Sequence, residues 1–145
     1  MNKYPKQKDI IIIDSEAHSG KEYGGHSSEN IRRPMVVVSS DEYNQSTGMI
    51  IGMPIISADK SAYPLLFKPI MVTNGDGTGI KGYVITWQSQ NFDFYARNGA
   101  IVNRVSDIFL AIYKRLSKIY MVFANVETVF IIGSCLFYEH IDANA

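Results

Sequence analysis

Two adjacent arginines, Arg32 and Arg33, end a polar, glycine-rich segment and stand directly before a proline. A guanidinium stays charged at every physiological pH, and its planar fork of N–H donors matches the oxygens of a phosphate. An arginine at the end of a long loop is well placed to meet such a ligand. The alternative is a surface arginine that pairs with a neighbouring acid. The pair is therefore a candidate for phosphate chemistry.

The three histidines bear on whether that chemistry uses a metal ion. His18, His26 and His140 are too scattered for a ligand spacing, so we expect no metal site. His26 lies close to Arg33 in the sequence, and histidine titrates near neutral pH, which suits general acid–base catalysis. A histidine that is merely solvated is the alternative. The single cysteine, Cys135, excludes an intrachain disulfide and fits a reducing compartment.

The net charge of zero conceals an asymmetry along the chain. The first 118 residues hold all 14 Lys and Arg and 11 of the 14 acidic residues, which gives +3, and the remaining 27 residues carry −3. The densest basic segment runs from residue 97 to residue 118. A basic body suits a polyanion such as a nucleic acid. A solvated helix face is the alternative for that segment.

Hydrophobic patterning in these 145 residues predicts a single domain of short strands followed by one helix. A long loop over residues 15–33 is expected between the first two strands, and Pro34 is expected at the first position of the second. A capped helical turn should follow Ser40, and another should cover residues 92–97. A hairpin loop is expected over residues 74–77. Strands are predicted at residues 9–14, 35–38, 49–56, 63–72, 79–88 and 100–102.

The predicted helix begins after Ser106, whose hydroxyl suits a helix N-cap. Ile108, Ile112, Leu116 and Ile119 recur at helical spacing and form the apolar stripe of an amphipathic helix. Many short strands followed by a helix predict a mainly β fold with helices (α+β), either a small barrel or a sandwich. The pattern alone does not choose between these two.

Several short motifs follow one another along the chain. They are Gly20-Lys21-Glu22-Tyr23-Gly24-Gly25, Arg33-Pro34 with the strand after it, Asp41-Glu42-Tyr43-Asn44, Pro54-Ile55-Ile56-Ser57, Gly82 to Gln88, and Asp93 with Ala96-Arg97. In this order the motifs resemble the MazF/PemK family of toxin ribonucleases. The resemblance covers roughly residues 8–120, and it implies an SH3-like β-barrel of the CcdB/MazF/PemK type with a long C-terminal helix. Residues 1–121 would form the toxin domain, with 122–145 as an apolar extension.

The resemblance also implies an activity and partners. Members of the family are toxins of type II toxin–antitoxin pairs and cleave single-stranded RNA at a short sequence, without a metal ion or other cofactor. The ribose 2′-hydroxyl attacks the adjacent phosphorus, which needs a base, an acid and cationic donors at the phosphorane oxygens. For this chain we therefore expect single-stranded RNA as the substrate, a cognate antitoxin as a partner, and a homodimer.

Arg33 matches the active-site arginine of the family's Arg-Pro pair, and Ser57 matches a serine at a strand end, so we predict that both are catalytic. The alternative for Ser57 is a strand-end cap. Arg32 ranks below Arg33 because the family places its arginine directly before the proline. Asp93 and Arg97 match family positions that we interpret as an internal ion pair or a turn. The predicted RNA contacts are Glu22, His26, Arg32, Thr86 and Gln88.

The chain also departs from the family. Seven residues, His26–Arg32, stand where the family usually has one. Ile56 replaces a threonine, and Ile85 and Trp87 replace an arginine and an aspartate of the PemK-like branch. An isoleucine cannot transfer a proton, and Trp87 is either a core residue or a base-stacking one. An endoribonuclease is the first prediction. The alternative is a catalytically impaired member that binds an antitoxin-like peptide or a gyrase-type target.

The C-terminal segment after Glu127 is apolar, but its longest uncharged run is eleven residues, too short to span a bilayer. We expect it to pack against the body of the protein or against a second subunit, because exposed apolar surface is a liability. The apolar run near the N-terminus is too short for a signal peptide. We therefore expect a cytoplasmic protein with no membrane association.

Overall fold

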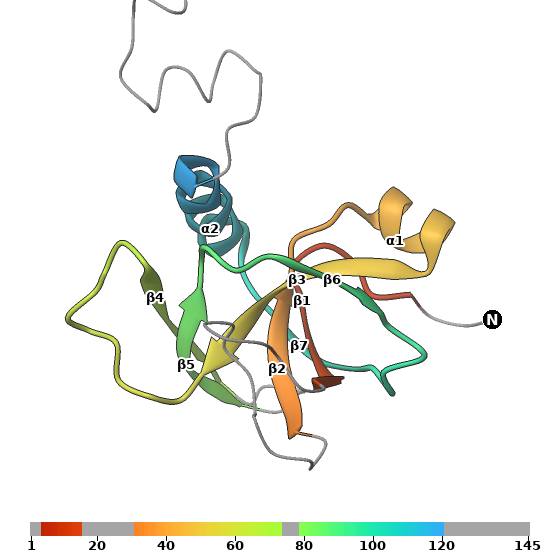
Figure 1. Cartoon of the computed structure of the whole chain (residues 1–145), viewed down its shortest axis with the longest axis horizontal. Helices are drawn as coiled ribbons and strands as arrows, with labels where there is room; N and C mark the ends of the chain where they lie inside the picture. Colours follow the sequence, from red (N-terminus) through yellow and green to blue (C-terminus); the bar gives the residue numbers. More distant parts are fainter. Residues whose placement is uncertain (1–3, 16–30, 74–78, 121–145) are drawn as a thin grey trace, which may run out of the picture.

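The structure is a computed structural model that describes residues 4–15, 31–73 and 79–120 (Figure 1). Within these residues the chain forms seven strands and two helices, so the predicted mainly β class with helices is confirmed. None of the helices in the described part of the chain is long and apolar enough to cross a membrane. The elements are β1 (Asp9–Ser15), β2 (Ile31–Val37), α1 (Asp41–Thr47), β3 (Met49–Ile56), β4 (Phe67–Val72), β5 (Ile80–Ile85), β6 (Gln90–Asp93), β7 (Ala100–Arg104) and α2 (Asp107–Tyr120).

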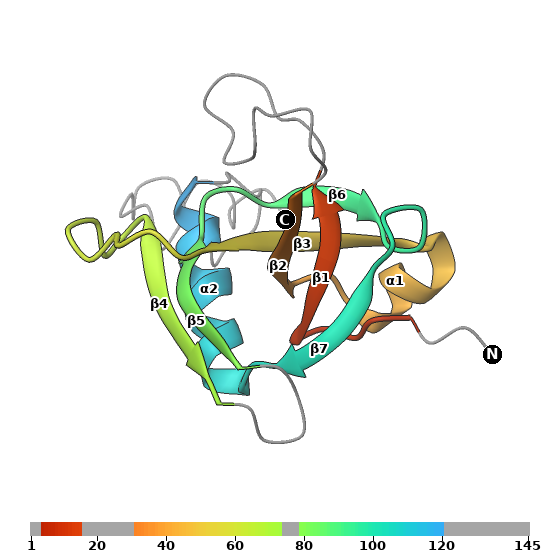
Figure 2. The same cartoon turned by 90° about the horizontal axis from the view of Figure 1, so that it is seen from below.

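The strands form one antiparallel sheet in the order β4-β5-β3-β2-β1-β7, and β6 pairs with β3 beside this path. The sheet curls into a half-barrel, and the long β3 crosses it (Figure 2). On one edge β3 pairs first with β6, from Met49 to Gly52, and then with β5, at Ile55 and Ile56. Pro54 lies between these two ladders, at a position where neither ladder requires an N–H from β3.

The ladder between β2 and β3 runs from Val37 opposite Gly52 to Met35 opposite Pro54, and there it ends. The N–H of Val38 donates to the carbonyl of Ile51 on β3 (2.9 Å). The direction in which the backbone nitrogen points alternates from one residue of a strand to the next, so the nitrogen of Pro34 points toward β3, as that of Val38 does. Proline has no N–H to donate there. The two strands therefore separate beyond this point.

The prediction that Pro34 opens the second strand was wrong. Proline lies fourth in β2 and is paired with Ile12 of β1, so β2 begins at Ile31, inside the segment expected to be a loop. Proline is tolerated there because its nitrogen faces the side on which the ladder to β3 has ended. This correction matters for function, because it places Arg32 and Arg33 on a strand, where neighbouring side chains point to opposite faces.

Both faces of the sheet are covered by apolar clusters, which explains the continuous apolar run of β1. Ile10 packs in the cluster that includes Leu110 and Tyr113 of α2, whereas Ile11 packs in a second cluster with Phe92 and others. Strands buried on both faces read as unbroken β-branched runs rather than as an alternation. A third, smaller cluster of Ile56, Phe67 and Ile85 lies at the β3–β5–β4 end of the sheet.

Helix α2 begins where Ser106 predicts, because the N–H of Phe109 donates to the Ser106 hydroxyl (3.4 Å). The predicted apolar stripe is confirmed at Leu116, which is buried, but it was wrong at Ile108 and Ile112, which are 74% and 40% exposed. The helix instead buries the face that carries Leu110, Tyr113 and Leu116. That face includes a large aromatic ring, so burying it removes more apolar surface from water than burying the isoleucines would.

The remaining expectations were met in part. Ser40 caps α1, and the strand at residues 49–56 is confirmed. The turn predicted over 92–97 is present but begins later, because residues 90–93 form β6 and the turn covers residues 94–98. The strand expected at 63–72 begins only at Phe67, and the strand expected at 79–88 ends at Ile85. The expected hairpin loop at 74–77 lies outside the described residues.

Candidate functional site

A cavity of about 220 Å³ lies between the first half of β2 and the end of β3, and it is called the Arg33 cavity below. Its shape follows from the early end of the β2–β3 ladder at Pro34, which leaves the side chains beyond that point to line an opening. The cavity brings together residues of β2, β3 and β5 with Ser57, which directly follows β3. Its lining consists of Arg32, Arg33, Pro34, Ile55, Ile56, Ser57 and Lys81.

Arg33 is half-buried in this cavity. Its Nε atom is buried and has no hydrogen-bond partner among the described residues. An unpaired, buried guanidinium N–H is costly, whereas the same group facing an anion makes a strong charge-assisted hydrogen bond. The position of Arg33 therefore suits binding of an anionic group such as a phosphate.

Arg32 has a different environment from its neighbour. Its guanidinium donates to the carbonyls of Asn98 (2.9 Å) and Ile12 (3.3 Å), and it lies 3.6 Å from the carboxylate of Asp14. These contacts tie β1 and β2 to the turn before β7. Arg32 also lines the Arg33 cavity, but its Nη2 already donates to two carbonyls and its Nη1 faces Asp14, which agrees with the alternative of a surface arginine paired with an acid.

Lys81 joins the site from β5, although no sequence motif indicated it. A Cβ atom at the neighbouring Gly82 would collide with the carbonyl oxygen of Ile56, so only glycine lets β5 approach β3 this closely. This approach carries the exposed Lys81 to the same cavity as the exposed Ser57 at the end of β3. The available signal was that Lys81 is the one basic residue between Lys68 and Arg97.

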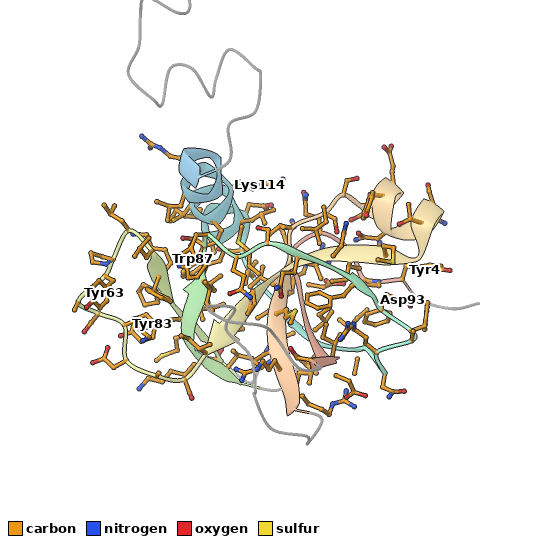
Figure 3. All side chains as sticks on the ribbon, viewed as in Figure 1. Tyr4, Tyr63, Tyr83, Trp87, Asp93 and Lys114 are labelled. Atoms are coloured by element: carbon orange, nitrogen blue, oxygen red, sulfur yellow. The ribbon has the colours of Figure 1, made fainter. Side chains whose placement is uncertain are left out.

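A second cavity of about 550 Å³ adjoins the first and is called the Tyr83 cavity below. The two cavities share Ser57 and Lys81, and the remaining lining of the larger one is mostly apolar. Tyr83 lies on β5 directly after the Gly82 approach (Figure 3). The other lining residues are Pro69, Ile70, Met71, Gly82 and Phe109.

The phenol of Tyr83 is held in place by a carboxylate. Its hydroxyl donates to Oδ1 of Asp59 (2.9 Å), and the backbone N–H of Ser61 donates to the same oxygen (2.9 Å). The bond from Ser61, and then that from Tyr83, lowers the pKa of Asp59 below its usual range. The bond to Asp59, together with burial, raises the pKa of Tyr83. At neutral pH the pair is therefore a neutral phenol bound to an ionised carboxylate, an arrangement that fixes the ring.

The positions where the resembling family carries polar catalysts belong to the core of this protein. Ile56 and Ile85 are buried in the third cluster, and Trp87 packs against that cluster with its ring edge-to-face on Phe67 (centroids 6.5 Å apart). Thr86 is also fully buried, and its hydroxyl donates to the carbonyl of Leu66 (3.0 Å). These side chains hold the segment after β3 on the sheet.

The other predicted site residues are placed as follows. Gln88 is buried, and it lines neither cavity. Glu22 and His26 lie outside the described residues. The carboxylate of Asp93 accepts a hydrogen bond from the N–H of Ala96 (2.9 Å), so of the two predicted roles, an ion pair or a turn, Asp93 has the turn. Residues 4–15, 31–73 and 79–120 contain no group of three or more His, Cys, Asp or Glu that would hold a metal ion.

Comparison with known proteins gives consistent results. A family model described as PemK-like, MazF-like toxin of type II toxin-antitoxin system matches residues 6–120. The solved structure of MazF (Form-I) from Deinococcus radiodurans is 21% identical, with a TM-score of 0.66, over 80% of this chain and 94% of that chain. The MazE-MazF complex (Form-III) from the same organism is 21% identical, with a TM-score of 0.60, over 79% and 94% of the two chains.

An endoribonuclease in complex with its cognate antitoxin from a mycobacterial species is 14% identical, with a TM-score of 0.55, over 80% of this chain and 93% of that chain. At these identities the likeness concerns the fold. No curated protein matches the sequence. The predicted C-terminal extension, residues 122–145, lies beyond both the family match and the described residues.

Proposed function

Because the chain belongs to the family of PemK-like, MazF-like toxins of type II toxin–antitoxin systems, we propose that it is an endoribonuclease that cleaves single-stranded RNA without a metal ion. The observation that carries the proposal is the Arg33 cavity. It gathers a half-buried guanidinium whose Nε has no partner among the described residues, an exposed ammonium and an exposed hydroxyl. This set of donors suits a phosphodiester.

In the proposed reaction the ribose 2′-oxygen forms a bond to the adjacent phosphorus, and the bond from phosphorus to the 5′-oxygen breaks. The products are a 2′,3′-cyclic phosphate and a 5′-hydroxyl, so the proton lost by the 2′-hydroxyl is balanced by one gained at the leaving oxygen. Arg33 and Lys81 offset the charge that develops on the phosphorane oxygens, and Ser57 donates a hydrogen bond to one of them. Preorganised donors of this kind supply a large part of such a rate enhancement.

The proton transfers require groups other than these three. The described lining of the Arg33 cavity contains no carboxylate and no imidazole. We propose that water, or His26 of the segment before β2, moves these protons, and that Glu22 contacts the RNA. Arg32 then supports β2 and the cavity rim, and we leave Thr86 and Gln88 out of the proposed RNA contacts because both are buried.

Cleavage of a labelled single-stranded RNA pool of mixed sequence in EDTA tests the proposal. We expect the native chain to release fragments with 5′-hydroxyl ends, and we expect Arg33→Ala and Lys81→Ala to lose most of this cleavage. Arg115→Ala is the matched control, because Arg115 is an exposed cation of α2 that lines neither cavity. No cleavage by the native chain, or equal cleavage by Arg33→Ala, would overturn the nuclease proposal.

The second candidate is a catalytically impaired toxin relative that acts by binding a peptide of its antitoxin or a gyrase-type target. The observation in its favour is that Ile56 and Ile85 are core residues where the resembling family has polar catalysts. A chain that binds its antitoxin with full affinity but leaves every RNA pool intact would have this second function.

We also propose that the protein acts as a homodimer and that an antitoxin is its regulatory partner. Ile108 and Ile112 lie one turn apart on α2 and are exposed, and together they form an apolar strip suited to a subunit contact. Light scattering of Ile108→Glu/Ile112→Glu beside the native chain tests the dimer. A native mass of one chain, or an unchanged dimer mass in the double variant, would exclude this strip as the interface.

A further inference from the structure

An RNA nucleotide carries a negative phosphate and a flat, largely apolar base a short covalent distance apart. The two adjoining cavities offer the same two features in the same order. Arg33 and Lys81 supply positive charge at the smaller cavity, and the larger one has a mostly apolar lining that includes the ring of Tyr83. Ser57 and Lys81 line both cavities, so a single bound nucleotide would place its phosphate in one cavity and its base in the other.

We propose that Tyr83 is an RNA-binding residue that stacks the base next to the phosphate held by Arg33. This inference rests on the proposed nuclease function and gives Tyr83 a role that the resemblance did not imply. A base stacked on Tyr83 would fix the position of its neighbouring phosphate at the junction of the two cavities. The residue would therefore set both RNA affinity and the register of cleavage.

The ring of Tyr83 is held in position by the protein itself. Its hydroxyl is bound to Asp59, and Asp59 is in turn held by the N–H of Ser61, in the segment that leads away from β3. The ring is half-buried and packs beside the third core cluster. A ring that is already fixed loses little conformational freedom when a base stacks on it, so more of the stacking energy appears as affinity.

The surroundings of Tyr83 also fit a flat apolar ligand. Pro69 lies opposite Tyr83 on β4, and Met71 lies opposite Lys81, so these four side chains share one face of the β4–β5 hairpin. Met71 is 62% exposed, although it is a large apolar residue. A base lying on this face would cover apolar surface that otherwise stays in contact with water.

Charge distinguishes RNA from a peptide as the occupant. An apolar peptide segment would also cover Met71 and Tyr83, but it would leave Lys81 and Arg33 without an anion. A nucleotide satisfies the apolar face and the cations together. Stacking on an aromatic ring tolerates any base, so we expect Tyr83 to contribute affinity and position rather than base identity.

The test uses the full-length protein and a single-stranded RNA pool of mixed sequence. Binding is measured by fluorescence anisotropy with 2′-fluoro RNA, which lacks the attacking hydroxyl and is not cleaved, and kcat/KM is measured with ordinary RNA. Tyr83→Ile removes the ring but keeps a β-branched residue suited to a strand, and Tyr83→Phe keeps the ring but loses the bond to Asp59. Tyr63→Leu is the control, because Tyr63 is a 57% exposed ring that lines neither cavity (Figure 3).

We expect Tyr83→Ile to weaken 2′-fluoro RNA binding roughly 5- to 150-fold, the factor that corresponds to the loss of one base–aromatic stack. Tyr83→Phe should weaken binding less than about threefold, because the stacking surface remains. Tyr63→Leu should bind as the native chain does. If Tyr83→Ile binds RNA normally while Arg33→Ala does not cleave, the stacking proposal is overturned and the nuclease proposal stands. If the native chain neither binds nor cleaves RNA, both proposals fail.

A second measurement covers the case in which Tyr83→Ile does not fold. RNA containing 4-thiouridine is irradiated on the native protein, and the crosslinked residue is identified by mass spectrometry. Crosslinks at Tyr83 or its cavity neighbours support the proposal, and crosslinks confined to other surfaces contradict it. Normal RNA binding by Tyr83→Ile together with reduced affinity for an antitoxin peptide would assign the cavity to the peptide instead.

Discussion

The two neighbouring arginines of β2 occupy two contrasting environments. Arg32 faces the β1–β7 side, where carbonyls of Ile12 and Asn98 and the carboxylate of Asp14 engage its guanidinium. Arg33 faces the gap beyond the β2–β3 ladder, and its buried Nε has no partner within the described part of the chain. The same residue type thus has two different environments one position apart, and we propose that the protein groups available to each guanidinium decide its role.

The largest expected effect distinguishes these environments directly. Arg33→Ala should lower kcat/KM for RNA cleavage about 100- to 1,000-fold, the range found when one donor to a developing oxyanion is removed. Its thermal stability should stay unchanged or rise, since the substitution removes a buried Nε that has no hydrogen-bond partner among the described residues. Steady-state cleavage and thermal unfolding on the same preparation measure the two effects. A large fall in stability would mean that Arg33 is a structural residue like Arg32.

The next effect concerns the approach of β5 that brings Lys81 to the cavity. Gly82→Ala places a methyl group against the carbonyl of Ile56, so β5 must move away from β3. We expect the free energy of unfolding to fall by about 2 kcal/mol, as in overpacked cores, together with a loss of cleavage as Lys81 shifts. Urea denaturation measures the first. Gly79→Ala is the control on the same segment, and native stability in Gly82→Ala would show that β3 and β5 are not in close contact.

A smaller effect is expected at Arg32, where a substitution should lower stability rather than cleavage. Arg32→Ala should destabilise the protein by about 1 kcal/mol, because hydrogen bonds to two carbonyls are lost, while the half-exposed ion pair with Asp14 adds little. Its kcat/KM for RNA should change less than about threefold. Urea denaturation and cleavage assays check both values. If Arg32→Ala lost as much cleavage as Arg33→Ala with native stability, the contrast between the two arginines would be wrong.

The smallest effect tests whether a missing partner alone marks a functional group. The hydroxyl of Tyr113 is also buried without a hydrogen-bond partner among the described residues, but Tyr113 lines neither cavity and packs in the main core. Tyr113→Phe should change the free energy of unfolding by less than about 0.5 kcal/mol and leave cleavage at the native rate, because it removes only an unsatisfied group.

The same substitution has a predicted pH dependence. Burial raises the pKa of Tyr113 well above its usual value of 10.0. A raised pKa in the folded state means that folding is unaffected below the unfolded pKa and that stability is lost as the pH rises above it. The native chain should therefore lose stability above pH 10.0 more steeply than Tyr113→Phe, which chemical denaturation at several pH values measures. Equal slopes would place the hydroxyl in contact with solvent.

Much of this protein is determined by the sequence alone. The β-branched run of β1, the cap at Ser40 and the cap at Ser106 fixed where elements begin, because each depends on neighbours a few residues away. The Arg33-Pro34 and Ser57 motifs identified two residues of the cavity through their resemblance to the family. The strand and the two caps depend on local geometry, and local geometry is what a sequence pattern records.

The tertiary structure alone decided the rest. Which face of α2 is buried depended on the sheet that it meets, so Ile108 and Ile112 remain exposed while Tyr113 is enclosed. Lys81 and Ser57 are 24 positions apart in the sequence, and only the close approach at Gly82 brings them to one cavity. The choice between Arg32 and Arg33 likewise depended on which partners β1 and β7 supply. Long-range pairing sets each of these outcomes, and no periodicity within one segment determines which distant segment it will meet.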